Sequence, residues 1–141
     1  MIKNTRMVIC QSIVTDKETN LVSYLNCLEE VRAIKFPIRL ASISLGMLWD
    51  KTSKKEITLK VRVNIENPSG IQKQLGEIKN VIKKTRHRLH VVMDGLAIEQ
   101  EGIYKFFVEY FEGGKWKKTD FVPLEVIKIK KPITTNSAEQ K

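Results

Sequence analysis

Residues 56–70, with the sequence EITLKVRVNIENPSG, decide the fold of this chain. Apolar and polar side chains alternate along the segment, and the apolar ones are Ile57, Leu59, Val61, Val63 and Ile65. A period of two with β-branched side chains indicates a strand that buries one face. The NPSG at its end predicts a turn, because Pro and Gly suit the dihedral angles of turns.

The same alternation extends in both directions from this strand. Further strands are expected over 38–49, 71–82, 87–94 and 102–111, with a return strand through Val122, Leu124 and Val126, and an N-terminal hairpin about TDKETN (15–20). Segment 71–82 is ambiguous, because its isoleucines and Leu75 also fit a helical spacing. Gly76 would weaken a helix by about 1 kcal/mol relative to Ala, so strand is favoured and helix is the alternative.

Seven or eight short strands separated by turns predict an all-β fold, an antiparallel immunoglobulin-like β-sandwich. One domain over 1–131 is expected, followed by a mobile tail at 132–141 that lacks periodicity. Tyr104 follows Gly102 by two residues, before the last hairpin, where such sandwiches carry a tyrosine that bonds back to upstream backbone. The alternative for Tyr104 is an ordinary core tyrosine.

The order of these motifs resembles a known family. The segments are VICQSIVTDKETNLVSYLN, FPIRLASISLGMLW, VNIENPSG, GLAIEQEGIYKFFVEY and FVPLEV. Together they resemble a family of small, uncharacterised bacterial and phage proteins that are predicted to be immunoglobulin-like sandwiches, over roughly residues 7–127. The family has no assigned activity, so the resemblance implies a fold and carries over no functional residue.

Composition limits the location and the redox chemistry that we expect. The chain of 141 residues has 42% hydrophobic residues and no apolar run near the roughly 18–20 residues that span a bilayer, so a cytoplasmic protein is expected. Cys10 and Cys27 are expected to be buried, reduced thiols, and they would lie opposite each other if their strands form a hairpin. No zinc-binding spacing of Cys and His is present, and no cofactor is expected.

Catalytic residues are sparse, so we expect no enzyme and no metal site. The only histidines are His87 and His90. His90 and Asp94 share one face of a strand but would lie about 13 Å apart along it, too far for a hydrogen bond. His87 stands between Arg86 and Arg88 and is interpreted as an exposed surface residue.

Positive charge is concentrated in three loops. The net charge is +9, and the loops 50–55, 83–86 and 112–118 carry seven of these charges. Loops that follow alternate strands of a sandwich share one end, so these loops should converge there. The candidate anion- or partner-binding residues are Lys51, Lys54, Lys55, Lys83, Lys84, Arg86, Lys115, Trp116, Lys117 and Lys118.

We therefore expect a non-catalytic interaction module that binds another protein, and the family resemblance implies a phage or mobile-element origin. Loops on a rigid scaffold often carry binding, which favours this hypothesis. The alternative is sequence-independent binding of nucleic acid or another polyanion at the basic end, with Trp116 as a stacking face. The competing structural interpretation is that the lysines only keep exposed turns and strand edges soluble.

Overall fold

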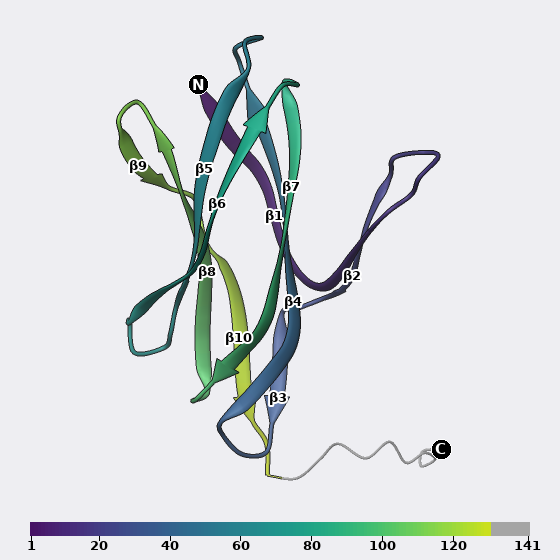
Figure 1. Cartoon of the computed structure of the whole chain (residues 1–141). Helices are drawn as coiled ribbons and strands as arrows, with labels where there is room; N and C mark the ends of the chain where they lie inside the picture. Colours follow the sequence, from purple (N-terminus) through teal and green to yellow (C-terminus); the bar gives the residue numbers. More distant parts are fainter. Residues whose placement is uncertain (131–141) are drawn as a thin grey trace.

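A computed structural model describes residues 1–130, and within them it contains ten β-strands and no helix (Figure 1). The all-β prediction is therefore confirmed, and no helix capable of crossing a membrane occurs in this part of the chain. The strands are β1 (Ile2–Thr15), β2 (Val22–Cys27), β3 (Glu30–Ala33), β4 (Ile38–Lys51), β5 (Ile57–Glu66), β6 (Gln72–Ile82), β7 (Arg86–Ile98), β8 (Gly102–Glu112), β9 (Lys115–Lys118) and β10 (Val122–Lys128). The tail predicted at 132–141 lies outside the described residues.

The strands form two sheets that pack face to face (Figure 1). The first, called the β4 sheet here, has the order β2-β1-β4-β7 and is antiparallel. The second, called the β8 sheet, has the order β3-β10-β8-β5-β6, and β9 pairs with the far end of β8. The β8 sheet is mixed, because β3 pairs with β10 in parallel. No short loop joins these two strands, so nothing in the connection imposes the antiparallel direction that the sequence led us to expect.

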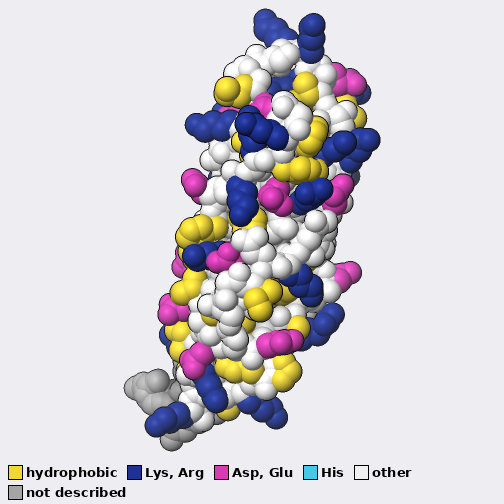
Figure 2. Space-filling view, turned by 90° about the vertical axis from the view of Figure 1, so that its left-hand side faces the viewer, with side chains coloured by type: hydrophobic (Ala, Val, Ile, Leu, Met, Phe, Trp, Pro, Cys, Tyr) yellow, Lys and Arg dark blue, Asp and Glu magenta, His cyan; other side chains and the backbone are white. Residues whose placement is uncertain are grey.

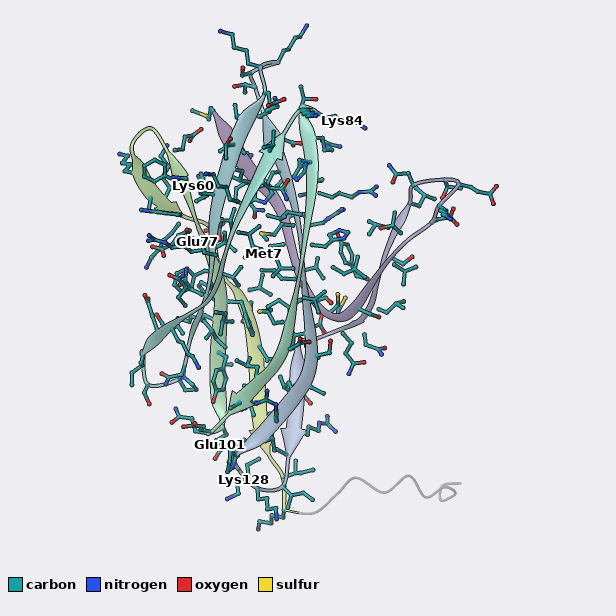
Figure 3. The ribbon with its side chains drawn as sticks, in the orientation of Figure 1. Met7, Lys60, Glu77, Lys84, Glu101 and Lys128 are labelled. Atoms are coloured by element: carbon teal, nitrogen blue, oxygen red, sulfur yellow. The ribbon has the colours of Figure 1, made fainter. Side chains whose placement is uncertain are left out.

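The inward faces of β4 and β5 supply the centre of the core. The alternating residues Leu59, Val61 and Val63 of β5 are almost completely buried, as is Trp49 of β4. The Trp49 ring packs edge-on against Tyr110 of β8, with the ring centroids 5.2 Å apart. Met7 of β1 also lies between the sheets (Figure 3). Burial of apolar surface contributes about 25 cal/mol per Å², so these buried side chains stabilise the packing of the two sheets.

Segment 72–82 is a strand, as favoured from the sequence, and a β-bulge explains its helix-like spacing. Val63 of β5 pairs with Gly76, and the next residue of β5 pairs with Gln74, so Leu75 has no partner. The extra residue shifts the alternation by one position, which lets Leu75 and Ile78, three residues apart, both pack against the core.

Tyr104 fixes the entry to β8. Its hydroxyl donates to the Gln100 carbonyl at 2.8 Å and accepts the Gln100 amide at 3.3 Å. Gly102 takes a φ of 130°, and a Cβ there would lie only 2.7 Å from the Pro68 side chain. The chain therefore passes close beneath the β5–β6 turn and returns through the Tyr104 hydrogen bond.

Candidate anion-binding cleft

The three basic loops lie at the same end of the sandwich. The β4–β5, β6–β7 and β8–β9 connections all lie toward the top in Figure 1. Lys84 is at this end in Figure 3, whereas Glu101 and Lys128 are at the opposite end. Lys54, Lys55, Lys83 and Lys84 are exposed there. Their positive charges therefore face solvent at one end of the molecule.

Two of the candidate residues have other roles at this end. Lys51 is only 5% exposed, and its ammonium group donates to the Lys55 carbonyl, so Lys51 closes the β4–β5 loop from inside. The Arg86 guanidinium forms an ion pair with Asp50 at 3.0 Å, and this hydrogen bond raises the pKa of Arg86. Arg86 remains exposed, so it can still reach a second anion.

The segment 112–118 is mostly strand and not an open loop. Gly113 and Gly114 both take a positive φ, which allows a two-residue turn, and the chain then continues as β9. The Trp116 ring is covered by the Arg62 guanidinium at 3.7 Å from its centroid and by the edge of Phe111. Trp116 thus lies over the outer face of the β8 sheet and does not present a free stacking surface at the tip.

Of the remaining lysines of β9, Lys118 shares that outer face, whereas Lys117 lies on the opposite face of the strand, beside Tyr110 and Glu112. Lys117 pairs with Glu112 at 3.0 Å, and the Lys118 ammonium lies 4.8 Å from the centroid of the Phe107 ring, while Lys115 is exposed. Figure 2 shows this side of the molecule, where Lys and Arg are mixed with Asp, Glu and hydrophobic side chains. The charge there is balanced locally and does not form a basic patch.

A basic cleft lies on the other side of the molecule, at the outer face of the β4 sheet. It is a hollow of about 650 Å³, and no Asp or Glu is among the described residues that line it. Its cationic residues are Arg6, Lys83, Lys84, Arg86 and Arg88. Asn20, Leu48, Val81 and His87 complete the lining. Of the ten residues predicted from the sequence, the cleft brings together only Lys83, Lys84 and Arg86.

The β1–β2 hairpin forms one wall of this cleft. It turns away from the β4 sheet in Figure 1, and Tyr24 packs so closely over Gly46 that a Cβ there would lie 2.5 Å from the ring. At its tip, the Arg88 guanidinium donates to the backbone carbonyl of Asn20 at 2.6 Å and to the Asn20 side chain at 3.2 Å. Arg6 stacks on the Tyr24 ring, 5.4 Å from its centroid. The hairpin is therefore attached to the sheet by two arginines.

The charge of the cleft comes from Arg and Lys rather than from histidine. Burial lowers the pKa of His87, which keeps the imidazole neutral near pH 7. The Nε2 atom of His87 is buried and has no hydrogen-bond partner among the described residues, which corrects the expectation of an exposed His87. Guanidinium groups suit carboxylate and phosphate oxygens because their donors form a planar fork. The cleft can therefore bind an anionic group.

Sequence reasoning missed Arg6, Asn20 and Arg88 as cleft residues. One signal was available, because Arg86 and Arg88 are two apart on a strand and must share its outer face, opposite the inward Leu89. Arg6 and Asn20 could be added only by knowing that the tip of the hairpin contacts Arg88 on the outer face of the β4 sheet. Among residues 1–130, the structure brings together no group of three or more His, Cys, Asp or Glu side chains that could hold a metal ion.

Comparison with known proteins identifies the family to which the chain belongs. No curated protein matches the chain. A family model described as a family of unknown function, DUF6941, matches residues 5–122. The match includes most of β1, the strands β2 to β9 and every cationic residue that lines the cleft, and it ends at the first residue of β10. Since it extends over most of the sequence, the chain belongs to the DUF6941 family.

Proposed function

We propose that this chain is a non-catalytic, cytoplasmic binding module of immunoglobulin-like fold, which holds an acidic segment of a partner protein in the basic cleft. The observation that carries the proposal is the convergence of five cationic side chains on one hollow without a lining carboxylate. A bacterial or phage origin, and a role in blocking or recruiting a host factor, rest on the family resemblance alone.

The strand order supports the immunoglobulin-like assignment. In the variable-type fold the strands named G, F, C and C′ lie side by side in one sheet, and β10, β8, β5 and β6 have this order. In the facing sheet β4 lies between β1 and β7, as strand B lies between strands A and E in the immunoglobulin fold. The hydrogen bond from Tyr104, at the start of β8, to the Gln100 carbonyl fits the tyrosine corner at the start of strand F in that fold.

An acidic protein segment suits the cleft better than a long nucleic acid. The hollow is closed on one side by the hairpin, and three of its five cations are arginines, which pair with carboxylates in a planar geometry. Trp116, the expected stacking residue for an unpaired base, is already covered by Arg62. Binding of a polyanion is the second candidate, because the exposed Lys54 and Lys55 lie at the same end of the sandwich and would extend a phosphate-binding path.

The test is a fluorescence-anisotropy titration with a labelled peptide rich in Asp and Glu and, separately, with single-stranded and duplex oligonucleotides. Reversal of Lys83, Lys84 and Arg86 to Glu should weaken peptide binding by more than about tenfold, which corresponds to about 1.4 kcal/mol. The matched control reverses Lys73, Lys128 and Lys130, which are exposed outside the cleft lining and change the net charge equally.

Equal losses in the two triple variants would show an effect of net charge and would refute the cleft as a site. Absence of peptide binding by the unaltered protein at low salt would refute the proposed function. Oligonucleotide binding with a log–log salt slope of about −3 to −5, lost in the cleft variant only, would establish the polyanion candidate in its place.

A further inference from the structure

Cys10 and Cys27 face each other at the base of the β1–β2 hairpin. They occupy directly opposite positions in the antiparallel pairing of β1 with β2. The Leu28 amide donates to the Ile9 carbonyl at 2.8 Å, so the adjacent cysteine pair falls at a position without mutual hydrogen bonds. Opposite Cα atoms at such positions are about 4.5 Å apart, a separation that a disulfide can bridge.

Cys10 is also the residue at which the hairpin leaves the β4 sheet. The pairing of β1 with β4 ends at Cys10, which lies opposite Ser44, and the pairing of β1 with β2 begins at the same residue. A disulfide between Cys10 and Cys27 would therefore join β1 to β2 at the point where the hairpin separates from β4. This point lies between the rest of the β4 sheet and the hairpin wall of the cleft.

The two thiols differ in access. Both cysteines are free, and Cys27 is exposed whereas Cys10 is completely buried. This corrects the expectation that both are buried. Burial is the main cause that raises the pKa of Cys10, and the nearby Cys27 sulfur is the second. An oxidant from solvent therefore meets Cys27 first, and Cys10 is placed to react second.

We propose that Cys10 and Cys27 form a reversible intramolecular disulfide when the protein meets a small disulfide such as oxidised glutathione. The Cys27 thiol loses its proton to solvent, and the resulting thiolate attacks one sulfur of the small disulfide, which breaks its S–S bond and releases one small thiolate. The Cys10 thiol then loses its proton to solvent and attacks the Cys27 sulfur, releasing the second small thiolate. Two electrons pass from the cysteine pair to the small disulfide, and the two released protons convert its halves to thiols.

This modification regulates the cleft if the proposed function holds, because the hairpin carries Asn20 and Tyr24 beside the basic residues. A crosslinked hairpin loses fewer conformations when a ligand enters, so the oxidised protein should hold the acidic peptide several-fold more tightly. The reduced protein should bind the same peptide with faster dissociation.

The experiment incubates the intact protein with oxidised glutathione and follows its mass and its thiols. The unaltered protein should lose the mass of two hydrogens, lose both maleimide-reactive thiols and regain them with dithiothreitol. Cys10→Ser should stop at a stable glutathione adduct on Cys27, and Cys27→Ser should remain unmodified while folded. A glutathione adduct that persists on the unaltered protein, or an unmodified cysteine pair, would overturn the proposal.

Anisotropy titrations of the reduced, oxidised and double-serine proteins separate this proposal from the proposed function. If the disulfide forms and peptide affinity is unchanged, the modification stands and its control of the cleft is refuted. If no form binds the acidic peptide, the proposed function fails, whereas the mass result still decides whether the disulfide forms.

Discussion

Replacing Gly46 with Ala should push the hairpin off the β4 sheet. An added Cβ would lie 2.5 Å from Cε1 of Tyr24 and 3.1 Å from Cδ1 of Ile13. Ordinary contacts begin near 3.4 Å, so the Tyr24 ring must move by roughly 1 Å, and overpacking of this kind costs about 1–3 kcal/mol. Because Gly46 is on the central strand β4 and cannot retreat, the hairpin is the part that moves.

Gly76→Ala provides the matched control, because Gly76 is also in a strand and a Cβ there would meet no atom within 4 Å. It should leave stability unchanged or raise it by about 0.4–1 kcal/mol, through the lower entropy of the unfolded chain. Urea unfolding at fixed pH measures both variants, and Gly46→Ala should also weaken acidic-peptide binding. Equal unfolding midpoints for the two variants would refute the packing of Tyr24 on Gly46.

Three further outcomes follow from single contacts. Tyr104→Phe should lower the free energy of unfolding by about 1 kcal/mol or more, because the Gln100 carbonyl loses its buried donor, and an unchanged urea midpoint would reduce Tyr104 to a packed ring. Gly102→Ala should destabilise more than Tyr104→Phe, since its φ of 130° and the nearby Pro68 both oppose a side chain, and thermal unfolding of the two variants side by side would show the reverse order if this reasoning fails. Burial alone would raise the pKa of Glu112, but hydrogen bonds from Lys117 and the Ile2 amide outweigh burial and lower the pKa. The ionised Glu112 therefore stabilises the folded protein fully above the ordinary pKa near 4.5, and this contribution disappears as pH falls through the lower pKa of the folded state. Glu112→Gln should therefore destabilise at pH 7 and match the unaltered protein in strong acid, and a difference independent of pH in urea titrations would contradict this.

Strand periodicity predicted most of the fold because inward and outward residues alternate wherever one face is buried. The rule gave β5 directly, and it was ambiguous at β6 because the bulge at Leu75 shifts the phase by one residue. It missed β9, whose four residues include only one apolar side chain, Trp116, and that side chain packs on an outer face, where no apolar alternation is required. β3 was not among the predicted strands, because its four residues are too short for a periodic signal.

The cleft was less accessible to sequence reasoning than the fold. Connectivity of the strands placed the three basic loops at one end, and that inference needs only the direction of each strand. It gave no account of which side chains are already engaged, so Lys51 and Trp116 were included although one is buried and the other is covered by Arg62. The hairpin wall depends on contact between Tyr24 and Gly46, far apart in sequence, which periodicity does not report.

The parallel pairing of β3 with β10 sets an order for assembly during synthesis. β3 belongs to the first third of the chain, but its only partner in the β8 sheet, within the described residues, is the last strand. A ribosome must translate nearly the whole domain before β3 can dock, so the edge of the sheet stays unpaired until then. Contacts this distant in sequence are also slow to form, because the loop that they close is long. A nascent chain stalled before Val122 should therefore expose β3 to chaperones or to a strand of another copy.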